Sequence, residues 1–125
     1  MELDNNNRSV FLMNYHLVLV IKNRKKIIDH DVSERLKEIF LYIQPNYNIS
    51  LQEWNYQQDY VHVLFKGHPN SELSKFINAY KSASSRHIKK EFPLSEEHFW
   101  SKSFCLLTAD ESSEKFIKQY IETQK

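Results

Sequence analysis

The chain has 125 residues and a mass of 15.1 kDa, which fits one domain spanning residues 1–125. Its 17 Lys and Arg residues balance 16 Asp and Glu residues, so a formal net charge of +1 excludes a basic arm or an acidic tail as the main basis of function. A single cysteine excludes an intrachain disulfide, and the apolar runs are too short to cross a bilayer. We therefore expect a soluble cytoplasmic protein. The single glycine, Gly67, excludes the glycine-rich loops that bind nucleotide phosphates.

The first third of the chain predicts a flexible terminus, a strand and a helix. Residues 1–9 are polar and rich in Asn, and we expect them to form a flexible N-terminus. Residues 11–22 hold a short apolar run that is typical of a strand buried on both faces. A basic turn at residues 23–26 follows. Apolar side chains at helical spacing then predict a helix that begins near residues 31–33 and ends at Pro45.

The rest of the chain predicts a hairpin, a second helix, a last strand and a last helix. Alternating residues at 49–56 and 60–65 indicate two strands joined by a tight turn. A helix is expected over residues 71–90, with the hydroxyl of Ser71 as its N-cap. Residues 100–108 indicate the last strand, and the final helix follows residues 110–113. The order is β-α-β-β-α-β-α. It predicts an α+β fold, a ferredoxin-like βαββαβ sandwich with helices on one face and an extra C-terminal helix.

One histidine lies in a strand where it could bind a ligand. Tyr60 and His62 point to the same face of the sheet, because side chains alternate along a strand. His62 could present an imidazole nitrogen to a metal ion from this rigid platform. A half-buried histidine that is hydrogen-bonded to a neighbour is the alternative, and the pattern alone favours it.

A tyrosine of the final helix could act as a nucleophile. Tyr120 and Gln124 are four residues apart and lie on one side of that helix. A phenol there could attack a phosphodiester, and the glutamine could add an oxygen ligand or orient the phosphate. The alternative, which the spacing alone favours, is that Tyr120 completes the apolar stripe of Phe116 and Ile117.

Basic residues gather in two places on a chain that is otherwise nearly neutral. Such patches favour phosphate backbones, and nearby serine hydroxyls can donate to phosphates. A solvated helix face is the alternative. The candidate DNA-binding residues are Arg24, Lys25, Lys26, Lys81, Ser85, Arg86, Lys89 and Lys90. Trp54 and Trp100 could stack on bases, although packing in the core is the better interpretation of each.

Several segments, in order, carry a family resemblance. They are residues 15–18 with 22–26, residues 59–64, residues 84–86, residues 99–104 and residues 120–124. Together they resemble the single-tyrosine HUH transposases of small bacterial insertion sequences, such as the REP-associated tyrosine transposases. The resemblance covers nearly the whole chain, from Tyr15 to Gln124.

The resemblance implies a chemistry and a set of roles. Tyr120 would attack single-stranded DNA and leave a 5′-phosphotyrosine link and a free 3′-OH. His62 would be the second histidine of a metal-binding pair and Gln124 a further polar ligand, with Mg²⁺ or Mn²⁺ as the ion that polarises the scissile phosphate. Members of the family are homodimers with joined sheets that bind DNA hairpins at element ends. The tyrosine of one subunit can complete the metal site of the other.

The sequence departs from the family at one metal-ligand position. Tyr60 stands where the first histidine of the motif belongs, and a phenol is a poor Mg²⁺ ligand at neutral pH. The leading hypothesis is a transposase that nicks and rejoins single-stranded DNA with a depleted metal site. The second hypothesis is a hairpin-binding protein that does not cut. A third, an RNA-binding module on the same type of sheet, is weaker because the strands lack the aromatic pattern of that class.

Overall fold

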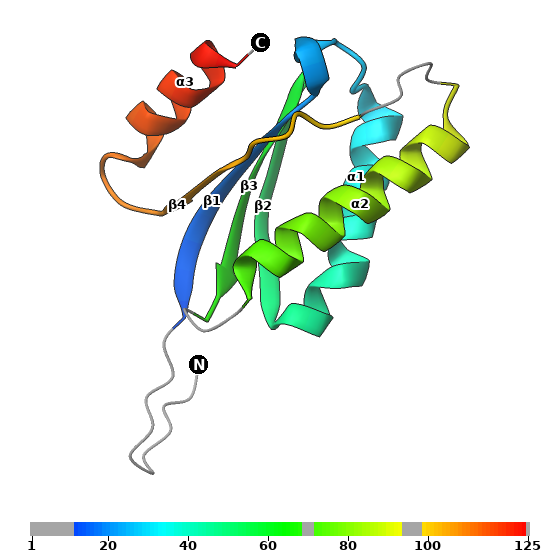
Figure 1. The fold of residues 1–125 in the computed structure, drawn as a ribbon. Helices are drawn as coiled ribbons and strands as arrows, with labels where there is room; N and C mark the ends of the chain where they lie inside the picture. Colours follow the sequence, from blue (N-terminus) through cyan, green and yellow to red (C-terminus); the bar gives the residue numbers. More distant parts are fainter. Residues whose placement is uncertain (1–11, 69–71, 94–98, 125) are drawn as a thin grey trace.

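The computed structural model describes residues 12–68, 72–93 and 99–124, and these residues form a four-stranded sheet with helices on both of its faces (Figure 1). The predicted terminus at residues 1–9 and the predicted cap at Ser71 lie outside the described residues. The elements are β1 (Met13–Val20), α1 (His30–Ile43), β2 (Ile49–Gln57), β3 (Tyr60–Gly67), α2 (Leu73–Glu91), β4 (Cys105–Thr108) and α3 (Ser113–Thr123), with two short 3₁₀ turns at Lys22–Arg24 and Gln44–Tyr47. No helix in these described ranges is both long and apolar enough to cross a membrane.

The sheet has the strand order β2-β3-β1-β4, and every neighbouring pair is antiparallel. This order and the βαββαβ succession confirm the predicted ferredoxin-like fold with an additional C-terminal helix. Val18 of β1 lies opposite His62 of β3, and His16 lies opposite Leu64. Because residues two apart share a face, this register places His16 and His62 on the same side of the sheet.

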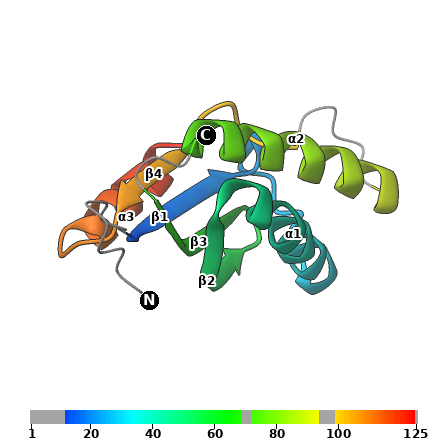
Figure 2. The same cartoon turned by 90° about the horizontal axis from the view of Figure 1, so that it is seen from below.

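The main core lies between the sheet and the pair α1 and α2, which lie side by side (Figures 1 and 2). Leu17 and Leu19 of β1 point into it, and aromatic rings of both helices and β3 fill its centre. Phe40 contacts the rings of four other aromatic residues, namely Trp54, Phe65, Phe76 and Tyr80. Burying each such side chain contributes about 1.5–3 kcal/mol, so this layer dominates stability.

The third helix covers the other face of the sheet. Val18 and Val20 point away from the main core and pack with Ile117 of α3 in a second, smaller cluster. Half-buried Cys105 and Tyr120 pack against it. The expectation of helices on one face therefore holds for α1 and α2. The third helix, α3, covers the opposite face, on which His16 and His62 lie.

The structure corrects two predicted boundaries. The helix expected to begin near residues 31–33 begins at His30, because the Asp29 carboxylate accepts a hydrogen bond from the backbone N–H of Val32 over 2.9 Å. The strand expected at residues 100–108 begins only at Cys105. Trp100 makes a single bridge with Ile21, and the backbone N–H of Ser101 donates to the Val20 carbonyl over 2.8 Å. Lys81 bonds to the carbonyls of Ser101 and Lys102 before β4 begins.

Candidate functional site

Two histidines from neighbouring strands meet on the sheet face that α3 covers. The Nδ1 atom of His16 lies 2.9 Å from the Nε2 atom of His62, and the ring centroids are 5.0 Å apart. The alternative interpretation of His62, a half-buried histidine bonded to a neighbour, therefore describes this structure. The role of His16 was not predictable from the sequence, because its contact with His62 depends on the register between β1 and β3, which strand patterns alone do not give.

The environment keeps His62 neutral near pH 7. Burial is the main cause that lowers the pKa of His62, and a positive charge on His16 would lower it further. The carboxylates of Glu114 and Glu53 act in the opposite direction and do not reverse the shift. A neutral imidazole is the form that can bind a metal ion.

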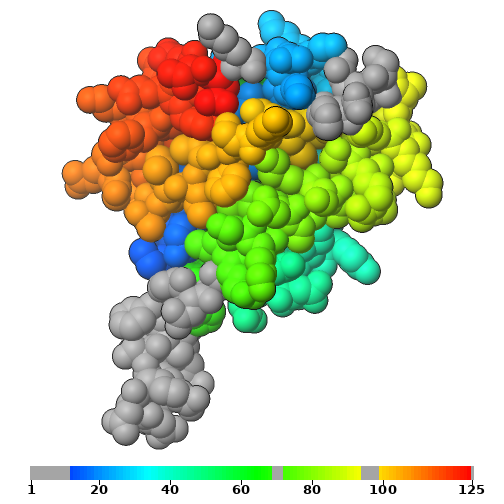
Figure 3. Space-filling view, in the orientation of Figure 1, coloured from blue at the N-terminus to red at the C-terminus, as the bar shows by residue number. Residues whose placement is uncertain are grey.

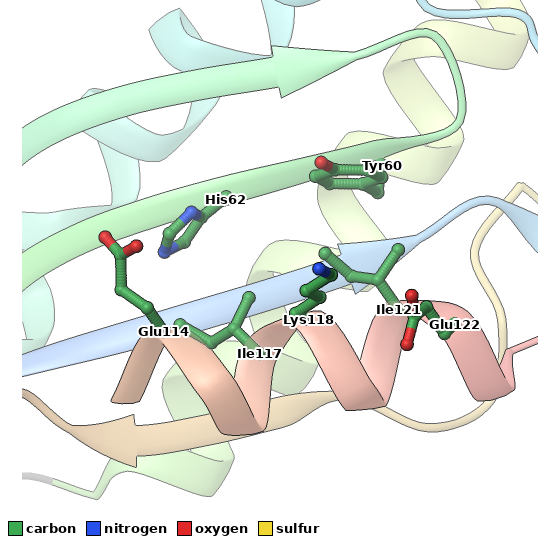
Figure 4. A pocket seen from close by; sticks show the side chains of 7 residues that line it. All are labelled: Tyr60, His62, Glu114, Ile117, Lys118, Ile121 and Glu122. Atoms are coloured by element: carbon green, nitrogen blue, oxygen red, sulfur yellow. The ribbon is translucent and has the colours of Figure 1, made fainter. Parts of the chain in front are cut away.

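A cleft of about 280 Å³ opens between β3 and α3 beside His62. Tyr60 and His62 form its strand wall, which confirms that these two side chains share a face. In Figure 4 the carboxylate of Glu114 is directed toward the His62 ring, and the Tyr60 ring lies at the start of β3, on the side of Ile121. The helix wall is lined by Glu114, Ile117, Lys118, Ile121 and Glu122. The cleft thus combines an imidazole, a phenol and charged groups of both signs.

The tyrosine of α3 belongs to a separate polar cluster. The Tyr120 hydroxyl lies 2.8 Å from the Ser103 hydroxyl, and the Ser103 hydroxyl donates to Oε1 of Gln124 over 3.0 Å. Either hydroxyl of the Tyr120–Ser103 pair can be the donor, and Ser103 can turn its single proton from Gln124 to the oxygen of a Tyr120 phenolate. Figure 3 shows α3 beside the segment at residues 99–108 that carries Ser103. The predicted proximity of Tyr120 and Gln124 is observed, whereas Ser103 had no signal in the sequence.

Tyr120 is protonated at neutral pH in this setting. Burial raises the pKa of the Tyr120 phenol, and the hydrogen bond with Ser103 opposes that rise. The tyrosine also packs against the smaller cluster, as the alternative interpretation expected, although Phe116 of the same stripe is 53% exposed. Its hydroxyl is therefore positioned by hydrogen bonds and its ring by apolar contacts.

Within one chain, Tyr120 and Gln124 hydrogen-bond with Ser103 and neither is among the residues that line the cleft beside His62. Within the part of the chain that is described, no three His, Cys, Asp or Glu residues are grouped to hold a metal ion. Gln124 does not line the cleft that Tyr60 and His62 share, whereas His16 and His62 together offer two converging nitrogens.

Two of the predicted DNA-binding residues stabilise the fold. The Arg24 guanidinium donates to the Asp59 carboxylate over 3.0 Å and to the Ile121 carbonyl over 2.9 Å. Lys81 donates to two backbone carbonyls, those of Ser101 at 2.8 Å and Lys102 at 3.1 Å. Burial lowers the pKa of Lys81. Each cation is thus engaged by oxygens of the protein itself.

The segment at residues 84–86, which is part of the family resemblance, has a buried and a surface part. Ser84 is fully buried, donates to the Tyr80 carbonyl over 2.6 Å and accepts from the Trp100 indole over 2.9 Å. It therefore cannot reach a phosphate, and Trp100 is a core residue, as expected. Trp54 likewise packs against the main core. Ser85 is partly exposed, and the predicted basic residues with exposed positions are Lys25, Lys26, Arg86, Lys89 and Lys90.

Comparisons with known proteins agree with this fold and with the order of the motifs. The family model described as IS200-like transposase matches residues 9–124. The ISDra2 transposase TnpA of Deinococcus radiodurans is 29% identical over 120 residues, which cover 92% of this chain and 86% of that protein. The chain therefore belongs to the IS200-like transposase family, as the resemblance predicted.

Solved structures extend the comparison. A crystal structure of a candidate transposase from Deinococcus radiodurans R1 superposes with a TM-score of 0.86 at 32% identity and covers 99% of this chain and 98% of that chain. The REP-associated tyrosine transposase bound to a REP hairpin superposes with a TM-score of 0.64 at 8% identity, over 93% of this chain and 68% of that chain. The second likeness concerns the fold alone.

Proposed function

We propose that this transposase nicks and rejoins single-stranded DNA at hairpin-bearing element ends, with Tyr120 as the nucleophile. The phenolic oxygen attacks the scissile phosphorus and the bond from phosphorus to the 3′-oxygen breaks. The phenol proton passes to solvent, and the leaving 3′-oxygen takes a proton from solvent to become the 3′-OH. The products are a 5′-phosphotyrosine link and a free 3′-OH. The observation that carries this proposal is the Tyr120 hydroxyl, held by Ser103 beside Gln124 on the last helix of an IS200-like transposase.

We further propose that Tyr120 acts at the site of a second subunit. Tyr120 and Gln124 hydrogen-bond with Ser103, and neither lines the cleft that holds His62 of the same chain. Ser103 lies two residues before β4, which lies at the sheet edge and, among the described strands, pairs only with β1. Pairing of two β4 edges would join the sheets of a homodimer and bring each Tyr120 toward the partner.

A divalent cation, Mg²⁺ or Mn²⁺, is expected at His62. When bound, it would withdraw charge from the scissile phosphate as a Lewis acid. His62 contributes a nitrogen from a rigid strand. Gln124 bonds to Ser103 and does not line the cleft of its own chain, so we propose that it adds its amide oxygen to the site of the other subunit. Tyr60 contributes a wall of the cleft and no strong ligand.

The exposed basic residues are proposed to bind the DNA backbone. Those on α2 are Arg86, Lys89 and Lys90, and those of the turn after β1 are Lys25 and Lys26. Cations of this kind neutralise phosphates without reading the base sequence, so affinity should fall as the salt concentration rises. Hairpin shape would then be read by the arrangement of these contacts.

A second candidate function is hairpin binding without cleavage. Two features favour it. By the resemblance to the family, Tyr60 stands where the first metal-binding histidine belongs. Burial also raises the pKa of the Tyr120 phenol, so less of the nucleophilic phenolate is present at neutral pH. Both functions require the same basic surface, so DNA binding alone does not separate them.

A covalent-adduct assay separates the two functions. The protein is mixed with a labelled single strand that carries an element-end hairpin, in the presence of Mn²⁺, and the products are run on a denaturing gel. We expect a protein–DNA adduct that disappears in Tyr120→Phe, while hairpin binding persists in both proteins. Tight hairpin binding with no adduct in the wild type would support the binding-only function.

A mixing experiment tests the shared site. Tyr120→Phe chains keep His62, and His62→Asn chains keep Tyr120. If each site combines groups from two subunits, a mixture of the two inactive variants regains adduct formation through mixed dimers. If each site is built within one chain, the mixture stays inactive.

A further inference from the structure

We propose that His16 supplies the second imidazole of the cation site, in place of the histidine that Tyr60 replaces. The site would then be built across two strands, by His16 of β1 and His62 of β3, and not along β3 alone. The catalytic meaning of this inference rests on the proposed function, but cation binding itself can be measured without DNA.

The distance between the two rings suits a shared ion. The facing nitrogens, Nδ1 of His16 and Nε2 of His62, are 2.9 Å apart. Two nitrogens that each lie about 2.1 Å from one ion are about 3.0 Å apart at a right angle and about 3.4 Å apart at a tetrahedral angle. The pair can therefore receive an ion with a small opening of the rings, provided that the N–H between them moves to the outer nitrogen of its own ring.

The sheet holds this pair in place. Val18 faces His62 across the ladder between β1 and β3, so His16 is the diagonal neighbour of His62 on the same face. His16 is also opposite Leu107 of β4, so its strand is hydrogen-bonded on both sides. Neither imidazole depends on a loop for its position, which is what a preorganised ligand pair requires.

The surroundings leave room for further ligands. The cleft beside His62 is open, and Glu114 on its helix wall acts electrostatically on the imidazole. Two protein nitrogens leave several positions of an ion to water or to phosphate oxygens, as a site that binds a DNA phosphate needs. Tyr60 lies at the start of β3, on the side of Ile121, and leaves this space open.

Two imidazoles also predict which ions bind best. Imidazole nitrogen favours first-row transition ions, with affinity rising from Mn²⁺ through Co²⁺ to Ni²⁺, and it binds Mg²⁺ poorly. A site made of one imidazole and oxygen ligands would discriminate less between these ions. The inference therefore assigns the chain a preference for Co²⁺ and Mn²⁺ over Mg²⁺.

The test is Co²⁺ binding to the DNA-free full chain, followed by calorimetry and by visible absorption of the bound ion. We expect His16→Asn and His62→Asn each to weaken binding by about tenfold or more. His30→Asn is the matched control, because His30 is exposed on α1, away from the cleft. The double variant His16→Asn with Tyr60→His should regain affinity, because it restores a second imidazole on the same face. A role in packing or hydrogen bonding alone would not be rescued in this way.

A second measurement needs no variant. Pulsed electron paramagnetic resonance of Mn²⁺ bound to the wild type should detect two directly coordinated imidazole nitrogens. One nitrogen, no binding at all, or unchanged Co²⁺ affinity in a folded His16→Asn protein would overturn the inference. Loss of the DNA adduct with cation binding intact would instead count against the proposed function, so the two failures are distinguishable.

Discussion

The Arg24 guanidinium donates a hydrogen bond to the backbone carbonyl of Ile121 over 2.9 Å, although the two residues are 97 positions apart. The same guanidinium is paired with the Asp59 carboxylate at 3.0 Å. The last carbonyls of a helix have no partner within the helix and attract cations. Arg24 therefore anchors the C-terminal end of α3, the helix that carries Tyr120, to the turn between β2 and β3.

Replacing Arg24 should loosen this end of α3. In Arg24→Ala we expect faster amide exchange in the last turn of α3 and a free energy of unfolding lower by about 1–3 kcal/mol, because the Asp59 carboxylate loses its partner. Arg24→Lys keeps the charge but not the two-pronged geometry of the guanidinium. Its free energy of unfolding should lie between those of the wild type and Arg24→Ala. Unchanged exchange near Ile121 in Arg24→Ala would show that the anchor is not needed.

Removing the Ser103 hydroxyl should change the pH dependence of the tyrosine. Burial raises the pKa of Tyr120 and the bond to Ser103 opposes this, so Ser103→Ala should raise that pKa further. Because the phenolate is the stronger nucleophile, adduct formation should increase with pH and its profile should move to higher pH in the variant. An increase of one in the pKa lowers the phenolate fraction at neutral pH about tenfold.

The measurement for Ser103→Ala combines adduct rates with NMR titration of ¹³C-labelled tyrosines, in which Tyr120→Phe identifies the signal. Identical pH profiles for the wild type and Ser103→Ala would remove Ser103 from the mechanism. Parallel loss of rate at every pH would point to misplacement of the ring instead of a changed pKa.

Lys81 and Lys90 should respond differently to truncation, although both lie on α2. Lys81→Ala removes two bonds to the carbonyls of Ser101 and Lys102 and should lower the free energy of unfolding by about 1–3 kcal/mol. Lys90→Ala should leave stability within about 0.5 kcal/mol. It should weaken hairpin binding and make the slope of log affinity against log salt concentration shallower by about 1, as expected for the loss of one phosphate contact. Denaturant unfolding and salt-titrated binding measure these effects, and a reversed pattern would contradict the assignment.

Introducing a histidine at residue 60 should strengthen cation binding at the proposed site. Tyr60→His places a third imidazole on the face that holds His62, and we expect Mn²⁺ affinity to rise about tenfold or more, with more DNA adduct at limiting Mn²⁺. Calorimetry with Mn²⁺ gives the affinity, and Tyr60→Phe is the control that removes only the hydroxyl. Equal Mn²⁺ affinity in Tyr60→His and the wild type would show that the tyrosine is not the defect.

The fold was predictable because its patterns are local. The stripe of Leu36, Ile39 and Phe40 defines the buried side of α1, and the apolar run of β1 defines a central strand. The limits of β4 were not predictable in the same way. Residues 101–104 resemble a strand in composition, but a backbone bond from Ser101 to the Val20 carbonyl and the side chain of Lys81, and not a continuous ladder, hold their backbone.

The candidate site was only partly predictable, because it depends on pairings between distant residues. The spacing of Tyr120 and Gln124 follows from one helix, and the sequence analysis found it. The contact between His16 and His62 depends on a strand register, and the bond from Ser103 to Tyr120 depends on where a non-repetitive segment runs. The sequence also did not predict which side of the sheet α3 covers, because both faces of β1 are apolar.

Mass spectrometry of the DNA adduct tests the central claim most directly. After reaction with a single-stranded element end and Mn²⁺, tryptic digestion yields the peptide of residues 119–125, in which Tyr120 is the only tyrosine. The account predicts a 5′-phosphonucleotide on this peptide at Tyr120. An adduct on any other residue, or hairpin-bound protein with no adduct under Mn²⁺ or Co²⁺, would contradict it.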